Sequence, residues 1–194
     1  MGQRSQIFVR YRHNKESKLI ATHLQWNYGE RMVSRARYTM EWLSCYSDGY
    51  ANMIYLYENK LRRIIEVNFD MKDVVIGDDI VKYFMENNRE PDNNMNDLVF
   101  YGYANNDGRL FIDYLPDGKI KYAFTGSEFS DTVMDAEHYM LWNLGEDWRS
   151  EMDDDDLECY EKNRKWIEEH TELMTLEELH EFIADNYFNP APFM

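Results

Sequence analysis

The sequence predicts a single α+β domain, residues 1–194, in which an antiparallel sheet packs against about five helices. Three observations support this fold class. Apolar residues alternate with polar ones near the N-terminus and in the centre, and they recur at helical spacing elsewhere. Hydrophobic residues make up 44% of the 194 positions, enough for a sizeable core. This composition excludes a collagen-like or mostly disordered chain.

The sheet is expected to combine an N-terminal hairpin with a central three-strand meander. A polar loop, His13–Lys18, separates the strands of the hairpin. Turns at Asn105–Gly108 and Pro116–Gly118 separate the strands of the meander, because Gly and Asn tolerate positive φ. The expected strands are Ile7–Arg12, Leu19–Gln25, Leu98–Tyr103, Leu110–Tyr114 and Lys119–Thr125.

Helices are expected on either side of the meander. The first runs to about Leu43, with Val33, Ala36 and Met40 on one buried face. A second begins near Asp48, although Ile64–Phe69 is also compatible with a strand. The other helices are expected from Asp78 or Asp79 to Glu86, from an Asp135 cap to Trp142, from an Asp156 cap to Glu168, and from the capping box Thr175-x-x-Glu178, burying Leu176, Leu179, Phe182 and Ile183.

Charge is distributed unevenly along the chain, whose net charge is −16. Residues 1–65 carry eleven basic and five acidic side chains, whereas the remainder carries ten basic and 32 acidic ones. The acidic side chains are dense in the helical last third, residues 131–194. Such asymmetry indicates either internal complementarity or two surfaces with different partners. It makes direct nucleic-acid binding the less favoured interpretation.

Sequence patterns for common catalytic and metal sites are missing. There is no Gly-rich phosphate loop, HExxH or CxxC, so no cofactor and no metal are expected. Cys45 could pair with His23 as nucleophile and base, or it could be a buried small hydrophobe. Two cysteines suit a reducing compartment, and no apolar run approaches the ~18 residues that span a bilayer, so a cytoplasmic protein without membrane contact is expected.

A dense acidic run is the first candidate for a partner-binding surface. Its carboxylates could imitate phosphates in a groove built for nucleic acid. Alternatively, they form a solvated loop and helix N-terminus favoured by the helix dipole. The candidates are Asp147, Glu151, Asp153, Asp154, Asp155, Asp156, Glu158 and Glu161.

A basic and aromatic stripe on the first predicted helix is the second candidate. Arg31, Arg35, Tyr38 and Trp42 follow one another at helical spacing. Guanidinium planes and aromatic faces suit stacked bases or a carboxylate-rich partner. Alternatively, the two aromatic side chains lie at the core edge and the arginines pair with the acidic last third.

A short motif near the N-terminus carries a resemblance to a known family. The motif residues are His23, Gln25, Trp26, Tyr28 and Gly29. Together with Met1-Gly2-Gln3-Arg4 and the strand Ile7–Arg12, the motif resembles small uncharacterised proteins of phages and mobile elements in low-GC Gram-positive bacteria. The resemblance covers about the first 45 residues and implies a setting in which small accessory proteins inhibit host defence, anti-CRISPR proteins included.

The motif also has a structural interpretation. Alternation along a strand places His23 and Gln25 on one face and Leu24 and Trp26 on the other. If the second pair faces the core, the first pair can hydrogen-bond a covering helix or loop.

These observations favour a noncatalytic inhibitor whose acidic segment occupies the basic nucleic-acid-binding groove of a host protein. Two alternatives remain open at this point. One is an unrecognised nuclease or hydrolase that uses His23 with nearby carboxylates. The other is an accessory protein that assembles into an oligomer or binds a host regulator through exposed aromatic residues.

Overall fold

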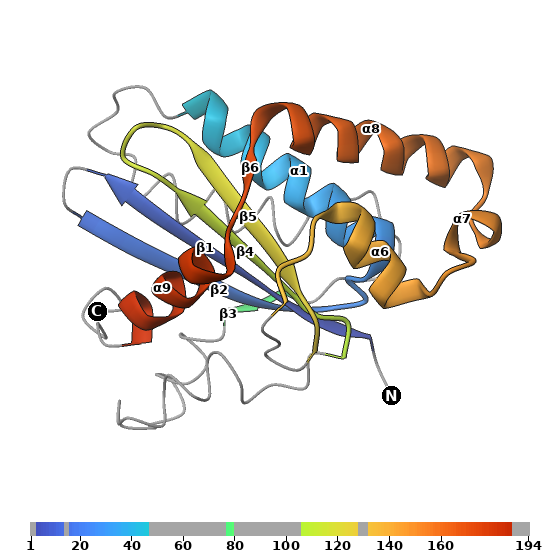
Figure 1. Cartoon of the computed structure of the whole chain (residues 1–194), viewed down its shortest axis with the longest axis horizontal. Helices are drawn as coiled ribbons and strands as arrows, with labels where there is room; N and C mark the ends of the chain where they lie inside the picture. The colour runs from blue at the N-terminus through green and yellow to red at the C-terminus, as the bar shows by residue number, and fades with distance from the viewer. Residues whose placement is uncertain (1–2, 14–15, 47–76, 80–105, 128–131, 188–194) are drawn as a thin grey trace.

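A six-stranded mixed sheet forms the centre of the computed structural model, which describes residues 3–13, 16–46, 77–79, 106–127 and 132–187 (Figure 1). The strand order is β3-β2-β1-β4-β5-β6. The strands are β1 (Arg4–His13), β2 (Glu16–Gln25), β3 (Gly77–Asp79), β4 (Arg109–Tyr114), β5 (Ile120–Thr125) and β6 (Glu172–Leu173).

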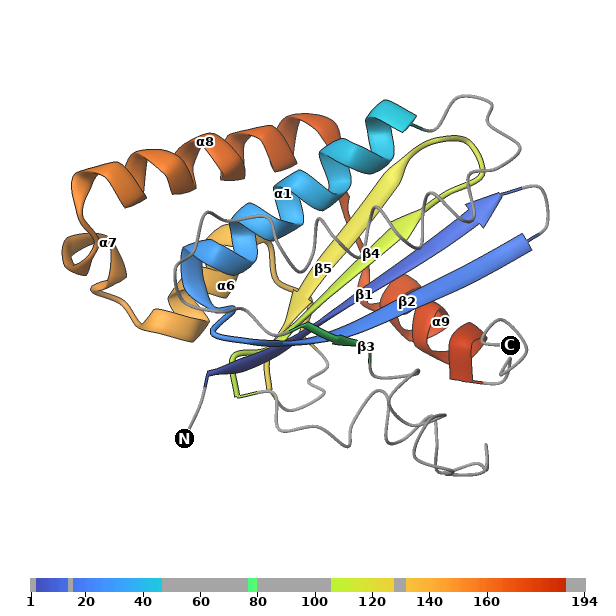
Figure 2. The ribbon, with the colours of Figure 1, turned by 180° about the vertical axis from the view of Figure 1, so that it is seen from behind.

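Five helices belong to the described part of the chain, in agreement with the α+β prediction. Helices α1, α6 and α8 contribute to the main core, and Figure 2 shows α1 lying alongside α8. The helices are α1 (Gly29–Tyr46), α6 (Ala136–Leu144), α7 (Trp148–Glu151), α8 (Asp154–His170) and α9 (Leu176–Tyr187). None of the helices in the described ranges is both long and apolar enough to cross a bilayer.

Strand β1 uses both of its faces, because side chains alternate along a strand. Ile7 and Val9 belong to the main core with α1, α6 and α8. Phe8 points the other way and stacks on Phe111 of β4 at 4.9 Å between ring centroids. Phe111 in turn meets Phe182 of α9 edge-on at 5.5 Å. The sheet is therefore covered by α1, α6 and α8 on one face and by α9 on the other.

Both predicted hairpins with described strands are confirmed. Strands β1 and β2 pair antiparallel from Arg4 opposite Gln25 to His13 opposite Glu16. Strands β4 and β5 pair antiparallel around the predicted turn, in which Gly118 adopts φ +85° and donates to the Leu115 carbonyl at 2.9 Å. The remaining predicted strand, Leu98–Tyr103, lies outside the described residues.

The prediction of a purely antiparallel sheet is wrong. Strands β1 and β4 pair in parallel, and strands β5 and β6 also pair in parallel. Both parallel pairs join segments far apart in the sequence, so their direction is set by tertiary packing and leaves no local signal. The helix expected from Asp78 or Asp79 is also wrong at its start, since both residues belong to β3, which pairs with β2.

The helix predictions are confirmed where they rest on periodicity or a capping box. Helix α1 buries Val33, Ala36 and Met40, as predicted. Asp135 caps α6, its carboxylate accepting the His138 N–H at 2.8 Å. The helix predicted from Asp48 and the possible strand Ile64–Phe69 lie outside the described residues.

The last two helices need two corrections. Helix α8 is capped by Asp153, whose carboxylate accepts the Asp156 N–H at 2.8 Å, so the prediction of an Asp156 cap is three residues late. The box of Thr175 and Glu178 opens α9 as predicted, with reciprocal hydrogen bonds of 2.9 and 3.2 Å. Leu176, however, is 37% exposed, whereas the other three predicted apolar residues are buried.

Candidate functional site

The acidic candidates gather at one end of the molecule, around α7 and the start of α8 (Figure 1). Local chemistry explains why this segment folds as it does. Asp147 precedes α7, and Asp153 precedes α8 and caps it. Asp154, Asp155 and Asp156 fill the first turn of α8, where the helix dipole favours negative charge.

Seven of these side chains form what we call the acidic end. All seven are exposed, and within the described part of the chain none of them makes an ion pair. Their charge is therefore presented to solvent. The acidic end consists of Asp147, Glu151, Asp153, Asp154, Asp155, Asp156 and Glu158.

The negative charge at this end extends to the start of α1. Glu30 is half-buried, and burial raises the pKa of its carboxyl group, with smaller contributions from the nearby charges of Asp156 and Asp153. The first turns of α1 and α8 therefore lie close enough for their carboxylates to interact.

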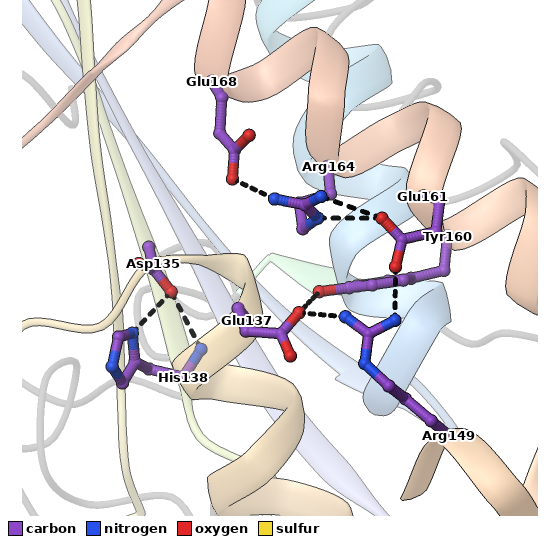
Figure 3. Close-up of polar contacts among 8 residues, drawn as sticks. All are labelled: Asp135, Glu137, His138, Arg149, Tyr160, Glu161, Arg164 and Glu168. Atoms are coloured by element: carbon purple, nitrogen blue, oxygen red, sulfur yellow. Dashed lines mark hydrogen bonds and ion pairs between the residues drawn. The ribbon is translucent and has the colours of Figure 1, made fainter.

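Glu161, the eighth acidic candidate, belongs to a different structure. Arg149 and Arg164 both bind its carboxylate, the latter at 2.9 Å (Figure 3). Burial acts to raise the pKa of Glu161, but these hydrogen bonds outweigh it and the pKa is lowered. Glu161 is therefore a structural ion-pair residue, and we do not count it with the exposed surface.

Arg149 connects α6, α7 and α8, whereas the partners of Arg164 lie on its own helix, α8. Arg149 also donates to Glu137 at 2.6 Å, and Arg164 donates to Glu168 at 2.5 Å. Tyr160 donates to Glu137 at 2.9 Å from within the core. This network was not predicted from the sequence, although the spacing of Glu161, Arg164 and Glu168 is typical of ion pairs along a helix. The guanidinium groups of Arg149 and Arg164 are thus already engaged in ion pairs.

The basic and aromatic stripe does not form one exposed surface. Arg35 is fully buried and donates to the Asn27 side chain, and burial, with a smaller effect of nearby Arg31, lowers its pKa to about 10. Trp42 packs against the core, while Tyr38 is 36% exposed with the Arg37 guanidinium 4.4 Å above its ring.

The expected pairing of these arginines with the acidic last third is not seen for Arg31. Its guanidinium lies 3.8 Å from Glu30 and contacts the Trp26 carbonyl at 3.5 Å. Arg31 therefore stabilises the beginning of its own helix and does not neutralise the acidic end.

The motif at 23–29 forms the junction between β2 and α1. Leu24 is in the core as expected, but Trp26 is 45% exposed, because β2 ends at Gln25 and Trp26 adopts φ +57°. The expectation that Leu24 and Trp26 share a face is therefore wrong. The backbone of His23 pairs with that of Gln6, and the backbone of Gln25 pairs with that of Arg4. The side chains of His23 and Gln25 lie outside the described part of the structure.

The second half of the motif holds α1 in place. Asn27, which the sequence analysis did not single out, is buried and donates to Ser5 at 2.8 Å. Gly29 adopts φ +53° and donates its N–H to Asn143 of α6 at 2.9 Å. A Cβ on Gly29 would lie 3.1 Å from Leu144, so a small residue is needed where α6 approaches. Tyr28 is half-buried, with Arg31 6.0 Å from its ring centre.

A catalytic arrangement is not evident in the described part of the chain. There, no group of three or more His, Cys, Asp or Glu side chains is placed to hold a metal ion. Cys45 and Cys159 are both exposed free thiols, so the expectation of a buried Cys45 is wrong. The proposed pairing of Cys45 with His23 involves a side chain outside the described part.

Comparison with known proteins gives no further guidance, since no family model, no curated protein and no solved structure matches the chain.

Proposed function

We propose that this protein is a noncatalytic inhibitor from a phage or mobile element, and that its acidic end binds a host protein that handles nucleic acid. One observation carries the proposal: seven exposed carboxylates crowd one end of the molecule without a described cationic partner. The resemblance of the first 45 residues to phage and mobile-element proteins suggests the setting.

The spacing of the acidic groups supports mimicry of a nucleic-acid backbone. Asp154, Asp155, Asp156 and Glu158 fall within about 6 Å of axis, at the helical rise of about 1.5 Å per residue. Duplex DNA carries one charge per about 1.7 Å of its axis. A groove that binds phosphates therefore meets a comparable charge density on α8.

The fold keeps this charge available. Arg149 and Arg164 bind Glu137, Glu161 and Glu168, so these two guanidinium groups are already paired with carboxylates that do not belong to the acidic end (Figure 3). A partner's arginine or lysine would therefore meet exposed carboxylates that make no described ion pair. Such complementary charge accelerates encounter and gives specificity.

A matched pair of charge reversals tests the proposal. D154K/D155K changes two exposed residues in the first turn of α8 and leaves the Asp153 cap intact. E177K/E181K changes two exposed carboxylates on α9 by the same total charge and serves as the control. Each tagged protein is incubated with a nuclease-treated lysate of a Gram-positive host, and the captured protein is then tested for DNA binding.

The proposal predicts that the wild-type chain and the α9 control capture one nucleic-acid-handling protein at low salt and release it at high salt. The wild-type chain should also displace a short DNA duplex from that protein, and D154K/D155K should do both much more weakly. Equal capture by both variants, or capture that salt does not weaken, would contradict binding through the acidic end.

A further inference from the structure

A shallow groove between α6 and β6 lies outside the surfaces described so far. Its volume is about 310 Å³, at the lower limit of small-molecule pockets, which range from about 300 to 1,000 Å³. The groove is therefore large enough for one side chain but small for a cofactor. The lining residues are Thr132, Val133, Met134, Asp135, His138, Leu141, Trp142 and Leu173.

The sheet creates this groove along the edge of β5. Phe124 of β5 pairs with Met134, which precedes α6, and Tyr122 pairs with Leu173 of β6. Two segments distant in sequence are thus fixed side by side on one strand. Leu141 and Leu173 remain 44% and 42% exposed, so the walls of the groove present apolar surface to solvent.

One wall of the groove is the Trp142 indole ring, which packs against the backbone of two glycines. A Cβ on Gly108 or on Gly126 would lie 3.1 and 3.2 Å, respectively, from carbon atoms of the Trp142 ring. The Tyr139 ring supports the same indole at 6.1 Å between centroids. Trp142 nevertheless remains 40% exposed. The ring is therefore supported from beneath while part of its surface is open to a ligand.

The polar side of the groove is negatively charged. Asp135 accepts the His138 N–H and lies 2.8 Å from the His138 ring Nδ1, which keeps the carboxylate in place (Figure 3). The charge of Asp135 also reaches Tyr122, whose pKa is raised by burial first and then by Asp135 and Glu168. Among the described residues that line the groove, Asp135 is acidic and none is Lys or Arg, so the groove carries a negative charge.

An indole face, a carboxylate and apolar walls together suit a guanidinium group. Arginine stacks on aromatic faces, pairs with carboxylates and buries its aliphatic stem along apolar surface. A neutral apolar ligand would gain no attraction from the negative charge of Asp135. We propose that this groove binds one arginine side chain of a basic partner, with the guanidinium over Trp142 and beside Asp135. The inference rests on the proposed function, because a nucleic-acid-binding surface is where such an arginine is found.

The test uses a tripeptide instead of the unidentified partner. Acetyl-Gly-Arg-Gly-amide is titrated into the ¹⁵N-labelled full chain, and its citrulline counterpart, equal in shape but uncharged, is the control ligand. We expect the arginine peptide to shift the Trp142 indole N–H signal and the Leu173 amide signal in a saturable manner. Citrulline should bind at least about fivefold more weakly, the loss of about 1 kcal/mol expected for a cation over an indole.

Two variants separate binding from folding. D135N retains an N-cap side chain for α6 but removes the charge, and we expect about two- to fivefold weaker binding of the arginine peptide. G126A keeps Trp142 but places a Cβ 3.2 Å from its ring, so it should weaken the same binding without unfolding the chain. Equal binding of both peptides, unchanged binding by both variants, or no shift at Trp142 would overturn the inference.

The result is independent of the acidic end. D154K/D155K should bind the arginine peptide as the wild-type chain does, because its substitutions lie outside the groove. If the peptide binds but no host protein is captured, the proposed function fails and the groove remains. If a host protein is captured through the acidic end but the peptide does not bind, only the groove inference fails.

Discussion

Asp113 of β4 joins the N-terminal hairpin to the rest of the sheet, and its removal should be strongly destabilising. Its carboxylate accepts hydrogen bonds from Arg10 at 2.9 and 2.7 Å and from Arg12 at 3.1 and 2.5 Å. The Arg10 and Asp113 side chains are only 3% and 6% exposed. D113A leaves the Arg10 charge buried without this carboxylate.

The size of the effect follows from this burial. Breaking a buried ion pair by removing one partner costs about 3–5 kcal/mol. Arg12 is 33% exposed and adds little to this, because solvent reaches it. In a chain of this size, such a loss lowers the melting temperature by about 6–20 °C.

Urea unfolding followed by circular dichroism measures the free energy of unfolding directly. R12Q and the exposed turn variant D117N are controls, and each should lie within about 1 kcal/mol of wild type. R10M/D113L, which removes both charges, should recover most of the loss. A D113A cost below about 1 kcal/mol, or an R10M/D113L variant no better than D113A, would refute the claim that one buried ion cluster connects β1 to β4.

Three further predictions concern caps, turns and pH. D153A should cost about 1 kcal/mol of unfolding free energy and D156A much less in the same urea assay, since only Asp153 caps α8; equal losses would contradict this. In thermal unfolding, G108A should lower stability more than G145A. Both glycines have positive φ, so either alanine would introduce about 1–3 kcal/mol of backbone strain, but only at Gly108 would the new Cβ also lie 2.4 Å from a carbonyl oxygen. Because the folded-state pKa of Glu161 is lowered, its contribution to stability is present above its unfolded-state pKa and lost as pH falls through the folded value. An acid titration of E161Q should therefore show a shallower loss of stability below about pH 4.5 than wild type, and an identical acid limb would disprove the role of this carboxylate.

Local signals explain most of what could be predicted of the fold. The hairpins, the Pro116–Gly118 turn and the core face of α1 depend on residues close in sequence, and they were predicted. The parallel pairing of β1 with β4 depends on segments about a hundred residues apart, and no periodicity records it. The start of α8 was missed because Asp153 and Asp156 have the same capping chemistry, and only tertiary packing selects between them.

The candidate site was predictable in part. The acidic residues of α7 and α8 are exposed, as a polar run suggests, but the pairing of Glu161 with Arg149 across two helices requires the fold. Arg35 was placed on a surface stripe, since arginine is rarely buried. In the fold it is buried against Asn27, a partner that its own helix does not contain.

Comparison of the two charge-reversal variants in one binding assay tests the central claim most directly. The affinity of the captured host protein is measured for the wild-type chain, D154K/D155K and E177K/E181K over a series of salt concentrations. We expect that only D154K/D155K loses affinity and that its logarithmic salt dependence becomes shallower than that of wild type, because fewer charges take part. Equal affinities and equal salt slopes for all three proteins would contradict an inhibitor that acts through its acidic end.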